Sequence, residues 1–253
     1  MSSLATRTIV GALLIVVAIT ALWIGGTVFW MLLTLGGLLM LREYALLLGC
    51  SGHEIRTAQF AFCIPLGVIA PLAAGPNYFA IGLIFGMAAA VYIVSRKSAL
   101  GAGLVYFGLA VFALIWLREH SGGFVLTLWA LALVWATDIG AFFAGRAIGG
   151  PKLAPAISPN KTWAGVGGGV LAALALGWAL HLYADLPVTL AIFSAPLAMV
   201  SQLGDLLESA MKRRAGVKDS GTILPGHGGI FDRLDGLVAS APFAALIVVL
   251  GTS

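Results

Sequence analysis

A short stretch near the C-terminal end of the sequence, residues 209–235, gathers side chains that bind phosphate together with side chains that bind metal. Lysine and arginine pair with phosphate oxygens, and aspartate supplies the oxygen ligands that Mg²⁺ prefers. A plain basic patch would lack the aspartates. The stretch therefore indicates a site for an anionic phosphate and its metal. It holds eight of the 24 charged residues of the chain: Lys212, Arg213, Arg214, Lys218, Asp219, Asp232, Arg233 and Asp235.

The segment from Ser201 to Lys212, which runs into this stretch, carries polar residues at spacings of three and four. These residues share one face of a helix, because positions three and four apart are neighbours on a helix surface. Ionisable groups inside a membrane span are costly and usually functional. A structural ion-pair stripe between helices is the alternative. The residues are Ser201, Asp205, Glu208, Ser209 and Lys212.

Asp232 and Asp235 open the last apolar segment and can face the same way. Negative charge at a helix N-terminus is favourable, so capping alone explains one aspartate but explains two beside Arg233 less well. Magnesium is typically held by one or two carboxylates plus substrate phosphates. Asp205 and Asp232 can supply these carboxylates from two helices, although spacing alone does not establish that they bind one metal ion together.

A glycine-rich turn, residues 224–230, separates the two acidic clusters. Gly228 and Gly229 let the backbone approach a phosphate closely and offer N–H donors, and His227 can bind phosphate or transfer a proton. Lys212, Arg213 and the nearby Lys218 supply cationic charge. The alternative for these cations is anchoring to anionic lipid.

A second polar segment, residues 152–162, offers further donors. Ser158, Lys161 and Thr162 precede a glycine-rich apolar run, without the spacing of a Walker A loop. An ordinary interfacial loop is the alternative. Asp138 lies inside another apolar run, where it can serve a substrate or a metal, or pair with Arg146 eight residues on.

These groups are carried by a chain that is 60% hydrophobic and 9% charged, with a mean hydropathy of +1.05. Continuous apolar runs of about 18 residues predict membrane-spanning helices, because lipid requires every backbone polar group to be paired internally. We expect one all-α polytopic membrane domain, with Gly165 and Gly169 at a close helix contact. The expected spans are 8–25, 27–48, 58–75, 78–95, 99–117, 122–145, 164–183, 188–207 and 234–251.

The basic residues predict the orientation. With the N-terminus on the cytoplasmic side, 13 of the 14 lysines and arginines fall in inner segments and only Arg118 falls outside. Both polar loops, 146–163 and 208–233, then face the cytoplasm. Arg42 and Glu43 are expected at the interface near the end of the second span. The net charge of +4 is explained by this topology, so nucleic acid is not an expected partner.

The run from Ser209 to Asp235 resembles the signature of the phosphatidate cytidylyltransferases, or CDP-diacylglycerol synthases. Residues 137–145 and 152–163 are also similar to that family, whereas the first half matches only as apolar spans. Two positions depart from its usual pattern: Phe142 replaces a common tyrosine, and Ala164 a common glutamate. The signature positions are Ser209, Lys212, Arg213, Lys218, Asp219, His227, Gly228, Gly229, Asp232, Arg233 and Asp235.

The resemblance implies that CTP and phosphatidate are converted to CDP-diacylglycerol and pyrophosphate with Mg²⁺, and with a second cation as an option. It implies that Asp205 and Asp232 hold the metal, with Asp138 and Asp235 as further candidates. The expected catalytic residues are Asp205, Lys218, Asp219, His227, Asp232 and Asp235. The expected substrate-binding residues are Ser158, Lys161, Thr162, Ser209, Lys212, Arg213, Gly228, Gly229 and Arg233.

The expected organisation is a single domain with N-terminal membrane helices in residues 1–134 and catalytic helices and loops in 135–253. The resemblance also implies a homodimer, and the expected location is the cell (inner or plasma) membrane. Two other functions stay open. One is a cytidylyltransferase that acts on another lipid phosphate. The other is an ion-coupled transporter that uses Asp138, Asp205 and Asp232.

Overall fold

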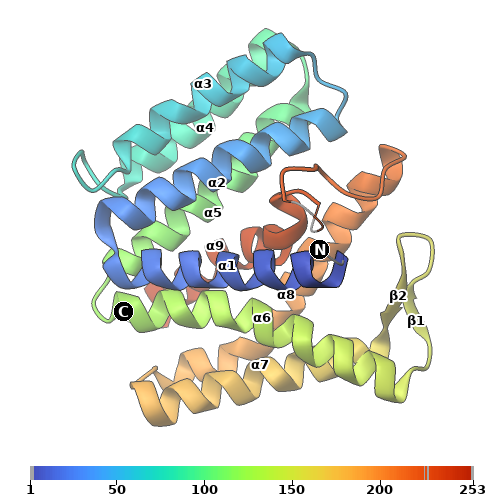
Figure 1. The fold of residues 1–253 in the computed structure, drawn as a ribbon. Helices are drawn as coiled ribbons and strands as arrows, with labels where there is room; N and C mark the ends of the chain where they lie inside the picture. The colour runs from blue at the N-terminus through green and yellow to red at the C-terminus, as the bar shows by residue number, and fades with distance from the viewer. Residues whose placement is uncertain (1–2, 225, 227, 252–253) are drawn as a thin grey trace.

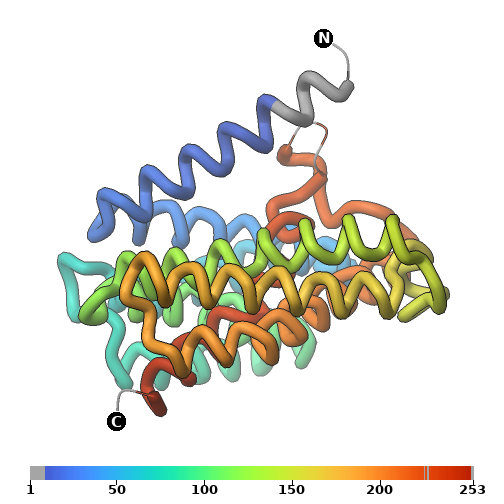
Figure 2. The backbone as a smooth tube through the Cα atoms, turned by 90° about the horizontal axis from the view of Figure 1, so that it is seen from below, coloured from blue at the N-terminus to red at the C-terminus, as the bar shows by residue number. Residues whose placement is uncertain are grey.

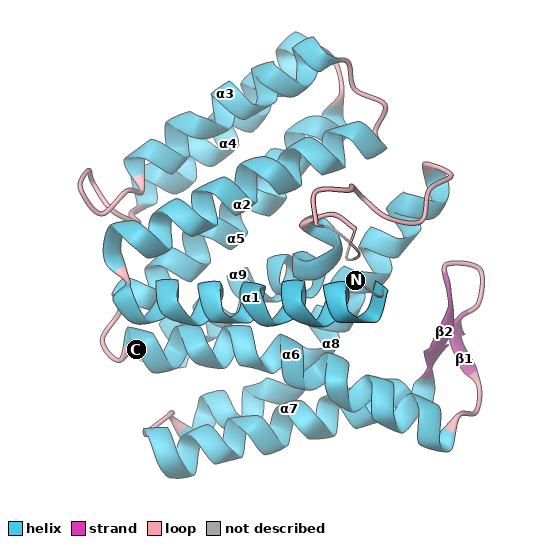
Figure 3. Ribbon diagram, in the orientation of Figure 1, coloured by secondary structure: helices cyan, strands magenta, loops and turns pink. Residues whose placement is uncertain are grey.

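The computed structural model describes residues 3–224, 226 and 228–251, and it is almost entirely helical (Figure 1, Figure 3). The predicted all-α fold is confirmed. The described part of the chain forms nine helices and one short hairpin: α1 (Ser3–Ile24), α2 (Gly26–Leu47), α3 (Gly52–Val68), α4 (Tyr78–Ser95), α5 (Ser98–Glu119), α6 (Gly123–Ile148), β1 (Lys152–Ala154), β2 (Ser158–Thr162), α7 (Trp163–Ala184), α8 (Val188–Arg214) and α9 (Phe231–Gly251).

Seven of the described helices are long and apolar enough to cross a membrane: α2 and α4 to α9. The other two correspond to predicted spans but are shorter. The described apolar part of α1 is Ile9–Ile24, and α3 has 17 residues and ends at Val68, where the prediction ran to residue 75. Pro65 lies in the last turn of α3, and the chain then continues through turns to Asn77, whose side chain caps α4.

Successive helices run antiparallel, so their connections gather at two ends of the bundle. In Figure 1 the β1–β2 hairpin and the segment between α8 and α9 lie at one end, and the C-terminus lies at the other. Helix α5 is central and contacts α2, α3, α4, α6 and α9. Its Phe107 packs edge-on against Tyr44 of α2 and Phe231 of α9.

Close backbone approach joins α6 to α7. A Cβ atom on Gly165 would lie 3.0 Å from the carbonyl oxygen of Ala141, and one on Gly169 would lie 2.8 Å from that of Thr137. The predicted contact through Gly165 and Gly169 is therefore confirmed, because no larger side chain fits there without a shift of the backbone.

Helix α1 lies against α2 and α6 and runs at an angle to the rest of the bundle (Figure 2). Its C-terminal end is fixed by Arg118 of α5. The guanidinium donates from Nε to the carbonyl of Leu22 at 2.9 Å and from an Nη atom to that of Trp23 at 3.4 Å. These carbonyls lie in the last turn of α1, where no intrahelical partner is available.

Two local structures differ from the predicted spans and loops. The polar segment 152–162 forms an antiparallel hairpin instead of an irregular loop, with Lys152 opposite Thr162 and Ala154 opposite Ser158. Helix α8 continues to Arg214, seven residues beyond the predicted end of its span. The polar residues at spacings of three and four therefore remain on one continuous helix.

Candidate active site

A single cavity of about 610 Å³ connects the charged residues to an apolar groove. Its apolar wall comes from α1, α2, α5 and α9, including Leu14, Leu32 and Leu114. Charged residues from α6, α8, α9 and the segment between α8 and α9 also line it. These residues are Asp138, Asp205, Glu208, Lys212, Asp219, Asp232, Arg233 and Asp235.

Lys212 of α8 joins two acidic groups in this cavity. Its Nζ lies 2.6 Å from Glu208 Oε2, one turn earlier, and 2.6 Å from Asp232 Oδ1 on α9. The side chains of Glu208 and Asp232 are only 1% and 3% exposed, so water screens these charges little. The ammonium group of Lys212 therefore forms ion pairs with two buried carboxylates.

Asp232 accepts three further hydrogen bonds through Oδ2. The backbone N–H of Ser220 donates at 2.8 Å, its hydroxyl lies at 2.9 Å, and the backbone N–H of Gly229 donates at 2.8 Å. Gly228 has a φ of 83°, and a Cβ atom there would lie 2.7 Å from the same oxygen. The glycine-rich turn thus wraps around Asp232, and a side chain at position 228 would be strained and crowded.

Asp205 is paired with a lysine from the hairpin. Lys161 Nζ of β2 lies 2.5 Å from Asp205 Oδ2, and the Ser209 hydroxyl donates to Asp205 Oδ1 at 3.3 Å. Asp138 and Asp235 line the same cavity as Asp205. The alternative of a pair between Asp138 and Arg146 is absent from the salt bridges of the described residues.

The remaining expected residues occupy several environments. Thr162 is buried, and its hydroxyl accepts a hydrogen bond from the Gly165 N–H at 3.0 Å, so it caps α7. Arg213 ties α8 to the hairpin by donating to the carbonyl of Ile157 at 3.2 Å. Ser158 is half-buried in β2, whereas Lys218 is exposed. His227, which was expected to be catalytic, lies outside the described residues.

Sequence reasoning missed Glu43. It was expected at the membrane interface, but it is fully buried in α2 and accepts hydrogen bonds from residues that precede or begin α9. Ser220, which donates to Asp232, was also missed. The signal at position 43 was an acidic residue near the end of an apolar span, and nothing local connected it with residues some 180 positions later.

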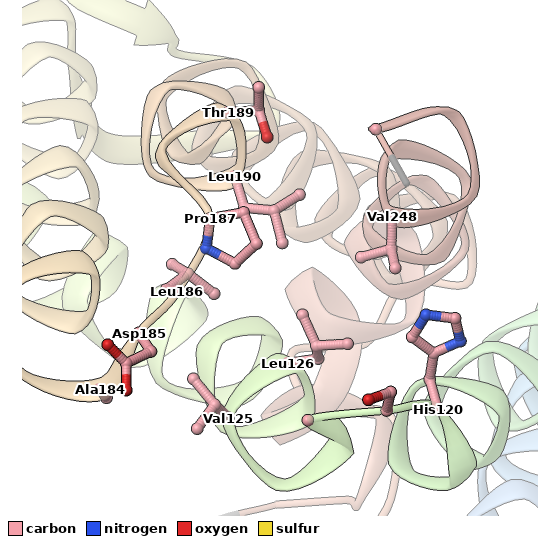
Figure 4. A pocket seen from close by; sticks show the side chains of 13 residues that line it. His120, Val125, Leu126, Ala184, Asp185, Leu186, Pro187, Thr189, Leu190 and Val248 are labelled. Atoms are coloured by element: carbon pink, nitrogen blue, oxygen red, sulfur yellow. The ribbon is translucent and has the colours of Figure 1, made fainter. Parts of the chain in front are cut away.

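A second cavity of about 480 Å³ lies at the opposite end of the bundle, between the α5–α6 and α7–α8 connections and the end of α9. Figure 4 shows His120 and Asp185 on opposite sides of it, with Leu126 and Leu190 between. None of the residues expected to bind substrate or metal lines this cavity.

The bundle of apolar helices, with a cavity lined by charges of both signs at one end, defines a polytopic membrane protein with a polar site. The chain belongs to the cytidylyltransferase family, whose model matches residues 5–250. This confirms the family that the signature indicated, and the protein is an integral membrane nucleotidyltransferase.

Three relatives named phosphatidate cytidylyltransferase show how far the similarity extends. The protein of Brucella suis biovar 1 (strain 1330) is 40% identical over 258 residues, which cover 99% of this chain and 94% of that one. That of Bacillus subtilis (strain 168) is 43% identical over 150 residues, 58% of this chain and 56% of its own. That of Haemophilus influenzae is 48% identical over 128 residues, which cover 48% of this chain and 44% of its own.

Proposed function

We propose that the protein transfers the cytidylyl group of CTP to phosphatidate, forming CDP-diacylglycerol and pyrophosphate. The observation that carries the proposal is the continuity of the 610 Å³ cavity, which joins an apolar groove to a cluster of charged residues. A lipid phosphate has the same division, since its acyl chains are apolar and its headgroup is anionic. The names of the relatives support this choice of substrates.

The cationic residues around the cavity suit a triphosphate. Lys161 and Lys212 lie inside the charged cluster, whereas Arg213, Lys218 and Arg233 are exposed around it. Charge-assisted hydrogen bonds from such groups are strong and favour phosphate oxygens. The N–H of Gly229 donates to Asp232, so the turn at Gly228 and Gly229 orients that carboxylate beside these cations.

The carboxylates at this end fit Mg²⁺. Asp205 and Asp232 supply oxygen donors from two helices, with Asp138 and Asp235 beside them. Among the described residues, no three acidic, histidine or cysteine groups form a ready-made metal site. The ion would therefore complete its coordination with substrate phosphates, as Mg²⁺ commonly does. When bound, it would offset the charge of the reacting phosphates, and a second cation in the same acidic cluster remains a prediction.

The reaction follows from positioning. An oxygen of the phosphatidate phosphate attacks the α-phosphorus of CTP, the new P–O bond forms, and the bond from that phosphorus to the bridging oxygen breaks. The electron pair leaves with pyrophosphate. Lysine and arginine groups offset the charge that develops, and the helices hold the two substrates together. No covalent enzyme intermediate is required.

The predicted topology places this chemistry on the cytoplasmic side of the plasma membrane, where CTP is available. The hairpin, which carries Lys161, and the α8–α9 segment, which carries Lys218, lie at the same end of the bundle (Figure 1). Cysteine labelling of single-cysteine variants in intact cells tests this orientation. The homodimer stays a prediction, and light scattering of the detergent-solubilised protein would measure its mass.

The decisive experiment measures CDP-diacylglycerol formation by the purified protein with CTP, phosphatidate and Mg²⁺. We expect robust turnover that is lost with EDTA and in Asp232→Asn. A folded wild type that turns over an isoprenoid ether-lipid phosphate but not phosphatidate would support the related cytidylyltransferase instead. Ion-driven substrate flux without CTP turnover would support a transporter.

A further inference from the structure

Glu43 links the N-terminal helices to the charged cavity although it does not line that cavity. It lies near the C-terminal end of α2, and its exposed fraction is 0%. Its Oε1 accepts the backbone N–H of Ile230 at 3.1 Å, and its Oε2 accepts that of Phe231 at 2.8 Å. The Ser220 hydroxyl lies 3.2 Å from Oε2. Glu43 takes part in none of the salt bridges among the described residues.

The bonds from Ile230 and Phe231 place a carboxylate at the start of α9. The first N–H groups of a helix have no intrahelical acceptor, and negative charge there is favourable. In this protein the acceptor comes from a different helix, nearly 190 positions earlier in the sequence. Glu43 therefore fixes where α9 begins relative to α2.

The chain around Glu43 has no room for larger residues. A Cβ atom on Gly221 would lie 2.5 Å from Glu43 Oε1, and a Cβ atom on Gly229 would lie 2.5 Å from Oε2. Both distances are too short for a real contact. Two glycines thus allow the segment between α8 and α9 to close over the carboxylate.

Ser220 connects Glu43 with the site. Its hydroxyl lies within hydrogen-bond distance of both Glu43 Oε2, at 3.2 Å, and Asp232 Oδ2, at 2.9 Å. A hydroxyl has one proton, so it donates to one carboxylate at a time. The backbone N–H groups of Ser220 and Gly229 also donate to Asp232. Displacement of this segment therefore displaces the groups that orient Asp232.

We propose that Glu43 is a positioning residue for the reaction. By holding Ser220 and the start of α9, it sets the position and orientation of the Asp232 carboxylate. This inference rests on the proposed function for its kinetic consequence, but the anchoring of the segment is a property of the fold itself. It also assigns a role in the site to a residue of the N-terminal half.

The test compares full-length Glu43→Gln, Ser220→Ala and the double variant with wild type. Glutamine keeps the size of the side chain, but its NH₂ group would face an N–H donor. We expect kcat to fall about 30- to 100-fold in Glu43→Gln, since small misplacements of reacting groups have effects of this order. The KM for CTP should stay within about threefold of the wild-type value. The residues expected to bind CTP, such as Lys161 and Arg213, lie on elements that Glu43 does not hold. The double variant should be no slower than the slower single variant, because both changes break one chain of contacts.

The matched control is Glu54→Gln. Glu54 is also a hydrogen-bonded acidic residue at a helix end, where it pairs with Lys97 of the α4–α5 connection at 3.0 Å, and it does not line the cavity. We expect wild-type kcat from this variant. A merely structural role of Glu43 would instead lower the melting temperature and the active fraction together, with additive effects in the double variant.

Hydrogen–deuterium exchange of the 219–232 segment provides a readout independent of turnover. We expect faster exchange there in Glu43→Gln and unchanged exchange in Glu54→Gln. Wild-type exchange and kcat in Glu43→Gln would overturn the proposal. If Glu43→Gln does not fold, wild-type kcat in Ser220→Ala would overturn it. A wild type without CTP turnover would sink the proposed function, while the exchange result would still decide whether Glu43 anchors the segment.

Discussion

The ammonium group of Lys212 lies 2.6 Å from Oδ1 of Asp232 and joins the end of α8 to the start of α9. The two helices are separated in sequence by the segment that wraps around Asp232. The ion pair therefore closes a loop whose backbone already donates to the other oxygen of the same carboxylate. A substrate phosphate that reaches this point meets an ordered pair of opposite charges.

Replacing Lys212 by methionine removes the cation that pairs with two buried carboxylates, those of Glu208 and Asp232. We expect a loss of stability of about 3–5 kcal/mol, because breaking a buried pair leaves charge uncompensated. The double variant Glu208→Gln/Lys212→Met should recover part of the melting temperature without recovering activity. Thermal unfolding in detergent measures the stability of each variant, and a turnover assay measures its activity. Equal melting temperatures of Lys212→Met and the double variant would contradict the pairing.

The substitution Gly229→Ala would place a methyl group 2.5 Å from Glu43 Oε2. We expect a loss of about 1–3 kcal/mol, as in other overpacked sites, together with a loss of activity. Gly167→Ala is the matched control, because no atom lies within 4 Å of its added Cβ. Wild-type melting temperature and turnover in Gly229→Ala would show that the segment adjusts freely.

Lys161→Met tests whether the hairpin contributes to nucleotide binding. We expect the KM for CTP to rise about tenfold, which corresponds to one charge-assisted contact of about 1.4 kcal/mol. Lys152→Met, on the neighbouring strand, is the control and should bind CTP as the wild type does. A fall in kcat at unchanged KM would instead assign Lys161 to the orientation of Asp205.

The Glu54 carboxylate predicts a specific acid sensitivity outside the site. Hydrogen bonds from the Ser51 backbone N–H and from Lys97 lower the pKa of Glu54 to about 2. A lowered pKa means that the contribution to stability is present above the unfolded-state value of about 4.5 and is lost as the pH falls towards 2. Glu54→Gln should weaken this part of the pH dependence of the melting temperature, and an unchanged profile would contradict it.

Much of the fold follows from local sequence, and much of the site does not. Apolar runs located the helices because lipid demands long uninterrupted spans. The spacing of Asp205, Glu208 and Lys212 placed them on one face of α8. The hairpin at 152–162 was missed because its short polar strands have no apolar alternation. Glu43 was missed because its partners, Ser220 and Phe231, are brought to it only by the packing of α2 against α9.

Arg118 gives the proposed topology a further consequence. It is the one basic residue at the outer end of the predicted arrangement, and its guanidinium binds carbonyls at the C-terminal end of α1. The partial negative charge of a helix C-terminus offsets a cation held there. Arg118 thus acts as a local counter-ion for the C-terminal end of α1, which explains how the fold accommodates a cation at the outer end of the predicted arrangement.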